Sequence, residues 1–123
     1  MNKRVFWTGF LFYFWLTGIF IVSSIPDIGS NEEKVLGFDK LAHFSEYFGL
    51  AVFFILMKRE RRQPVLPGHY LFLAIPLPFI EELHQLLIPG RQFSLMDIAA
   101  DWAGVSVVFA GYYLLNKLTV LKP

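Results

Sequence analysis

The chain contains no cysteine, and little of it is polar enough to form the surface of a soluble domain. The absence of cysteine excludes disulfide bonds and thiolate metal sites. The chain also lacks a glycine-rich phosphate-binding loop, a zinc-binding motif and a nucleophile elbow. Its one short basic run has no neighbouring aromatic platform for stacking bases, so we expect no nucleic acid partner.

Apolar and aromatic side chains dominate instead. Of the 123 residues, 55% are hydrophobic, and 14 are phenylalanine. Soluble domains are about 45–50% apolar with glycine included. The mean hydropathy of +0.50 agrees with this excess. The composition indicates an integral membrane protein, and the length leaves room for a single domain over residues 1–123.

Four apolar segments are long enough to cross a bilayer, at residues 5–25, 41–57, 70–88 and 98–115. A membrane helix needs about 20 residues at a rise of 1.5 Å each. The first segment could instead be a cleaved signal peptide. The other three could instead be buried helices of a soluble protein. Their number and combined length favour spans, because too little polar surface would remain to cover them. We therefore predict an all-α membrane protein with four transmembrane helices.

The distribution of lysine and arginine predicts the orientation. With the N-terminus inside, the cytoplasmic segments hold eight of the eleven basic residues: Lys3, Arg4, Lys58, Arg59, Arg61, Arg62, Lys117 and Lys122. The outer loops hold only Lys34, Lys40 and Arg91. Both termini are therefore predicted to be cytoplasmic.

Proline and glycine predict two local features of the helices. Pro76 and Pro78 should kink the third span about midway and free backbone carbonyls. Ala100 and Gly104 are four residues apart, which predicts a close approach between the fourth span and a neighbour. Residues 26–40 are expected to form an acidic outer loop.

Three of the segments carry ionisable or amide side chains near the end that would face outward. Residues three or four apart share a helix face. The pairs with this spacing are Asp39 and His43, Glu82 and Gln85, and Asp97 and Asp101. We expect the three faces to converge on one pocket.

Two acidic residues lie too deep in their predicted spans to be ordinary surface residues. By helix rise, Glu82 lies about 9 Å and Asp101 about 5 Å below the outer end of its segment. A carboxylate inside a span needs a proton, a cation or a paired base. Lys40 and Arg91 are expected at the rim as partners, and a divalent cation is a further candidate.

These considerations assign candidate roles. The candidates for proton transfer and charge stabilisation are His43, Glu82, Asp97 and Asp101. The candidates for substrate binding are Lys40, Tyr47, Gln85 and Arg91, since lysine and arginine bind phosphate or carboxylate groups. The candidates for a divalent cation are Asp39, Glu82 and Asp97.

Each of these residues also has a structural interpretation. Asp39 and Asp97 could be helix N-caps. His43 could form an interhelical hydrogen bond, and the Tyr47 ring fits an interfacial aromatic belt. Glu81 is expected to be the more peripheral of two adjacent acids, because one of them must turn away.

Five motifs in a fixed order carry a family resemblance. They are SSIP at 23–26, DKLAHFSEY at 39–47, ELHQ at 82–85, PGRQFSLMDI at 89–98, and Gly104. Together they resemble the VanZ-like family of small bacterial membrane proteins over nearly the whole chain. The resemblance implies four membrane helices in a bacterial cytoplasmic membrane and an association with low-level teicoplanin resistance. The family pattern has asparagine where this chain has Asp101, which adds a negative charge to the pocket.

Three functions are compatible with the sequence. The first is an outward-facing pocket that binds or acts on an envelope lipid or lipid-linked precursor, by phosphoryl or acyl transfer if it is an enzyme. The second is a module that binds a glycopeptide, a cell-wall stem or a partner without turnover. The third is a structural membrane protein whose polar cluster joins its helices. The sequence favours the first over the third, and membrane lipids are expected partners in each.

Overall fold

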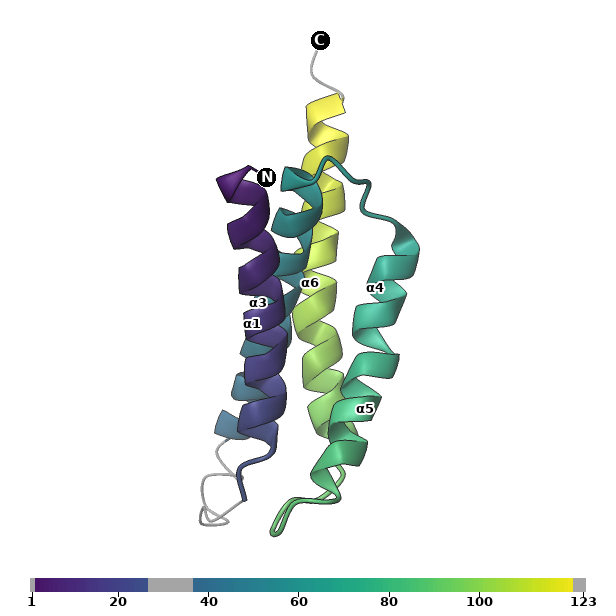
Figure 1. The fold of residues 1–123 in the computed structure, drawn as a ribbon. Helices are drawn as coiled ribbons and strands as arrows, with labels where there is room; N and C mark the ends of the chain where they lie inside the picture. Colours follow the sequence, from purple (N-terminus) through teal and green to yellow (C-terminus); the bar gives the residue numbers. More distant parts are fainter. Residues whose placement is uncertain (1, 27–36, 121–123) are drawn as a thin grey trace.

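The computed structural model describes residues 2–26 and 37–120, and it contains helices and no strand in these ranges. The helices are α1 (Lys3–Ser23), α3 (Phe38–Glu60), α4 (Pro67–Ala74), α5 (Pro76–Gln85) and α6 (Leu95–Val120). They run alternately up and down, so that the start of α1 and the end of α6 lie at the same end of the molecule (Figure 1). The all-helical prediction is confirmed. Most of the acidic loop expected at residues 26–40 lies outside the described residues.

Three of the helices are long and apolar enough to cross a membrane. They are α1, α3 and α6, with 21, 23 and 26 residues. They correspond to the first, second and fourth predicted segments. Their lengths and apolar composition support three of the predicted spans as candidate membrane helices.

The third predicted span, residues 70–88, is not one continuous helix. The structure divides this region into α4 and α5, which meet at Ile75. Pro76 is the first residue of α5, where its missing N–H costs nothing. Its ring would clash with the carbonyl four residues earlier in a continuous helix. The predicted kink is therefore confirmed, and it is a complete break.

The most extensive packing in the molecule is between α3 and α6. A Cβ atom at Gly104 would lie 2.4 Å from the Phe44 carbonyl oxygen and 2.8 Å from the Phe48 nitrogen. The two backbones approach closely only because Gly104 has no side chain. The close packing predicted for this part of the fourth span is confirmed.

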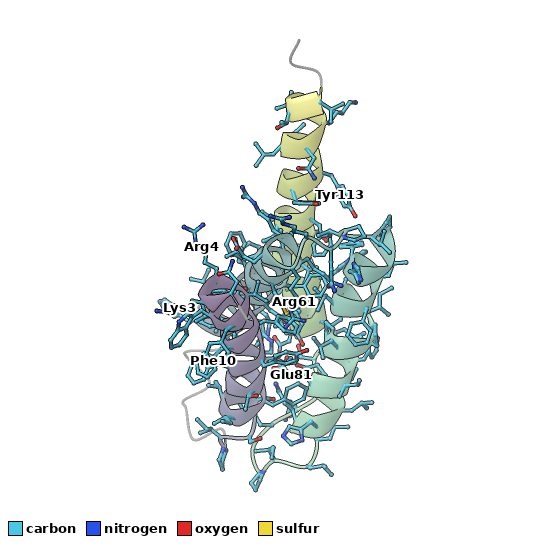
Figure 2. All side chains as sticks on the ribbon, turned by 45° about the horizontal axis from the view of Figure 1, so that its top comes forward. Lys3, Arg4, Phe10, Arg61, Glu81 and Tyr113 are labelled. Carbon is cyan, nitrogen blue, oxygen red and sulfur yellow. The ribbon has the colours of Figure 1, made fainter. Side chains whose placement is uncertain are left out.

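Large apolar side chains lie both in the interior of the helical bundle and on its outer surface. The buried core includes Phe12, Leu50, Phe54, Val105 and Phe109. Large side chains of α1 are exposed, among them Trp7 at 56% and Phe14 at 64%. Figure 2 shows Phe10 projecting from α1 away from the other helices. An apolar exterior of this extent is typical of a protein in contact with lipid.

Candidate functional site

The buried polar side chains gather in the half of the molecule opposite the start of α1 and the end of α6. Six of them, each at most 7% exposed, define the polar cluster: His43, Glu81, Glu82, Gln85, Asp97 and Asp101. They come from α3, α5 and α6. Figure 2 shows Glu81 lying between helices. The convergence of three helix faces that the sequence predicted is therefore present in the structure.

His43 links α3 to α6 at the centre of the cluster. Its Nδ1 lies 3.0 Å from Asp101 Oδ1, and its Nε2 lies 3.6 Å from Asp97 Oδ2. An ionised carboxylate only accepts hydrogen bonds, so with Asp101 ionised the shared proton is on Nδ1 of His43. The interhelical hydrogen bond considered for His43 is confirmed. The bond also fixes the ring with Nε2 toward Asp97, where it can exchange a proton or bind a cation.

Lys40 supplies a positive charge at the edge of the cluster. Its Nζ lies 2.6 Å from Asp39 Oδ2 and also donates to Asp97 Oδ1. The Lys40 side chain is 36% exposed, so one side of the ion pair faces outward. The N-cap of α3 is Gly37, whose φ of 74° favours glycine. The N-cap interpretation of Asp39 is therefore wrong.

Ser94 organises the start of α6. Its Oγ accepts the Asp97 N–H at 3.2 Å, as an N-cap side chain does. In a capping box, the Asp97 carboxylate would accept the Ser94 N–H in return. Here Glu82 Oε2 accepts that N–H instead, at 2.8 Å. The N-cap interpretation of Asp97 is wrong, and the Asp97 carboxylate is left free for Lys40 and His43.

Two residues are more deeply buried than the sequence suggested. Glu81 is 1% exposed beside Glu82 at 0%, so the expectation that Glu81 would turn away is wrong. Adjacent helix positions are about 100° apart, and the buried face of α5 is wide enough for both. Tyr47 is 0% exposed, which excludes the aromatic-belt interpretation.

Several buried polar atoms of the cluster and of Tyr47 lack a hydrogen-bond partner among the described residues. They are the Tyr47 hydroxyl, Glu81 Oε2, Glu82 Oε1 and Asp101 Oδ2. A buried polar atom without a partner costs about 1–3 kcal/mol. Gln85 is also buried, on the same face of α5 as Glu82, as predicted.

Arg91 lies at a different place from Lys40. Its Nε donates to the Ile25 carbonyl at 3.0 Å, and its Nη2 donates to the Val22 carbonyl at 3.4 Å. These carbonyls lie at and just beyond the C-terminal end of α1, where a cation is favoured by the helix dipole. The structure thus uses Arg91 to tie the loop before α6 to the end of α1.

Two sets of three side chains can place one ligand atom each within 4.8 Å of one another. One set is His43, Glu82 and Asp97, and the other is His43, Glu46 and Glu81. Glu82 and Asp97 were both predicted as cation ligands, whereas Asp39 belongs to neither set. Sequence reasoning did not assign Glu46 or Glu81 to the site. The spacing of Glu46, three residues after His43, was the available signal.

An open, largely apolar pocket of about 230 Å³ lies next to the cluster. It is lined by Phe14, Trp15, Gly18, Ile19 and Val22 of α1 and by Glu46 of α3. Within this lining, Trp15 and Glu46 are joined by a hydrogen bond, in which Trp15 Nε1 donates to the Glu46 carbonyl at 2.8 Å. Glu46 therefore connects an apolar pocket at the surface of the bundle with the polar cluster.

Comparison with known proteins agrees with the motifs. A family model described as VanZ/LLP1 matches residues 3–116. The match includes every residue of the polar cluster. No curated protein and no solved structure matches the chain.

Proposed function

The chain belongs to the VanZ/LLP1 family, and on that premise we propose that it binds an envelope lipid headgroup. In this proposal the protein crosses the bacterial cytoplasmic membrane four times, with both termini in the cytoplasm. The polar cluster faces the outer side and holds the anionic headgroup of an envelope lipid or lipid-linked precursor. The observation that carries the proposal is the burial of five acidic or basic side chains in a bundle with an apolar exterior.

The third crossing along the chain is assigned to α4 and α5 together. Their eight and ten residues, with Ile75 between them, span about 28 Å at 1.5 Å per residue. This is close to the hydrocarbon thickness of about 30 Å. The burial pattern of α5 is inverted relative to a soluble helix, because Glu81 and Glu82 are buried while Ile80 and Leu83 are more than half exposed. Lipid contact accounts for that pattern.

The orientation rests on the positive-inside rule. Lys3 and Arg4 begin α1, Lys58 and Arg59 lie in the last turn of α3, and Lys117 lies in the last turn of α6. These helix ends lie together at one end of the molecule (Figure 1). With that end in the cytoplasm, the polar cluster lies in the outer half of the membrane.

The packing of the helices favours a binding site over a purely structural cluster. The apolar core and the close contact at Gly104 already hold α3 against α6. Buried ion pairs are often no more stabilising than apolar side chains of similar volume. The cluster also leaves three of its polar atoms without partners among the described residues, which a network built only for stability would not do.

A lipid would match a charged group and an apolar pocket that lie close together. The Lys40 ammonium group, partly exposed at the edge, can exchange Asp39 for a phosphate oxygen. The pocket beside Glu46 offers an apolar surface for the first part of a hydrocarbon chain. A water-soluble ligand would need only the first of these features.

Lipid binding by the detergent-purified protein tests the proposal. Native mass spectrometry would compare phosphatidylglycerol and a polyprenyl phosphate with zwitterionic phosphatidylcholine. Lys40→Gln should weaken binding of the anionic lipids about tenfold, as expected for loss of one charge-assisted hydrogen bond. Lys58→Gln, which removes the same charge at the opposite end, should have no such effect. Equal losses in both variants would contradict the proposal.

We extend the proposal to teicoplanin tolerance, which the family resemblance suggests. Expression of the wild-type chain in a susceptible bacterium should raise the minimal inhibitory concentration of teicoplanin. Lys40→Gln should remove the increase at an equal level of protein in the membrane. An unchanged inhibitory concentration with wild-type protein would contradict this extension and leave the lipid-binding test unaffected.

A further inference from the structure

We propose that His43, Glu82 and Asp97 form a binding site for a divalent transition-metal ion of the Zn²⁺ or Mn²⁺ class. The three residues lie on α3, α5 and α6, so one ion would join the three helices of the polar cluster. Each offers one ligand atom within 4.8 Å of the others. Exposures of 7%, 0% and 7% place the site inside the bundle.

In each of the three side chains, one nitrogen or oxygen atom is bonded to a neighbouring residue. The second nitrogen or oxygen atom remains available to a metal ion. His43 Nδ1 is hydrogen-bonded to Asp101 Oδ1 at 3.0 Å, which leaves Nε2. Asp97 Oδ1 is paired with Lys40 Nζ, which leaves Oδ2. Glu82 Oε2 accepts the Ser94 N–H at 2.8 Å, which leaves Oε1.

The remaining atoms have the properties of metal ligands. Glu82 Oε1 is fully buried and has no hydrogen-bond partner among the described residues, so it is an acceptor that needs a ligand. His43 Nε2 and Asp97 Oδ2 are 3.6 Å apart. Two ligands on a tetrahedral Zn²⁺ ion, each at about 2.1 Å, are separated by about 3.4 Å. The observed separation of these two atoms is close to that value.

Asp101 has the position of an outer-shell residue. Metal-binding histidines commonly donate their second ring N–H to a carboxylate, which fixes the ring and raises its basicity. The Asp101–His43 hydrogen bond provides this arrangement. Asp101 thus acts on the ion through His43, as a positioning residue.

The ligand types select the class of ion. One imidazole nitrogen and two carboxylates suit Zn²⁺ or Mn²⁺, whereas Ca²⁺ takes six to eight oxygen ligands and Mg²⁺ keeps most of its water. The alternative set of His43, Glu46 and Glu81 is less well prepared, because Glu46 is only half-buried. Three protein ligands leave a coordination position that a water molecule or a phosphate oxygen would fill.

Metal retention by the detergent-purified protein tests the inference. The protein is stripped with a chelator, incubated with Zn²⁺ or Mn²⁺ alone, desalted and measured for metal content and thermal unfolding. The wild type should retain a stoichiometric ion and unfold at a higher temperature with it. Glu82→Gln and Asp97→Asn should each lose retention, and Asp101→Ala should weaken it about 10- to 100-fold. Glu60→Gln, at the other end of α3, should behave as the wild type.

Two results would overturn the site. One is a wild-type protein that retains neither ion, and the other is a Glu82→Gln protein that retains as much as the wild type. If a variant does not fold, metal retention by the wild type decides, and retention of neither Zn²⁺ nor Mn²⁺ overturns the site. The assays contain no lipid substrate, so failure here leaves the lipid-binding proposal standing.

Discussion

At the scale of single residues, the hydrogen bond between His43 and Asp101 organises the polar cluster. It joins α3 to α6 and determines which nitrogen of His43 faces Asp97. Asp101 is fully buried, and its Oδ1 is the hydrogen-bond partner of His43. The acceptor oxygen of Asp101 therefore matters for stability, in addition to its charge.

Asp101→Ala should destabilise the folded protein by about 1–3 kcal/mol, because the His43 N–H would be left without an acceptor. Asp101→Asn keeps an acceptor oxygen and should retain most of the stability. Unfolding in detergent, followed by circular dichroism, gives the free energies. If the two variants were equally destabilised, loss of the charge and not of the acceptor would explain the effect.

The sequence predicted the members of the cluster better than their partners. Spacing placed His43, Glu82 and Asp101 on inward-facing helix sides because helical periodicity is a local property. The pairing of Arg91 with α1 carbonyls and the contact between Glu82 and Ser94 depend on how a loop returns to the bundle. Such contacts between distant parts of the chain are not encoded in residue spacing.

At the scale of helices, apolar length determined what could be predicted. Long apolar segments predicted α1, α3 and α6, and Pro76 and Pro78 predicted a kink in the region that the structure divides into α4 and α5. The width of the buried face of α5 depends on the neighbouring helices, which is why Glu81 was misplaced. Gly104 marks the point where α6 comes closest to α3.

Gly104→Ala should push α3 and α6 apart, because its Cβ would lie 2.4 Å from a backbone oxygen that cannot move alone. Overpacking of this kind costs about 1–3 kcal/mol. Gly111→Ala on the same helix is the matched control, since a Cβ there meets nothing within 4 Å. Thermal unfolding in detergent should show a lower midpoint for Gly104→Ala alone. Equal midpoints for the two variants would mean that the helices are not closely packed at this point.

At the scale of the whole molecule, two opposite ends have different chemistry. One end carries basic side chains and contains the start of α1 and the end of α6. The other half contains the polar cluster. The proposed function requires that the half with the cluster faces outward. Orientation is therefore the claim on which the functional account depends.

The absence of cysteine allows orientation to be measured directly, since a single introduced cysteine is the only labelled position. Gln92→Cys lies in the exposed loop between α5 and α6, and Gln63→Cys lies in the exposed loop between α3 and α4. Intact cells would be treated with a membrane-impermeant maleimide. We predict labelling of Gln92→Cys in intact cells and of Gln63→Cys only after permeabilisation. The opposite pattern, or labelling of both positions in intact cells, would contradict an outward-facing site.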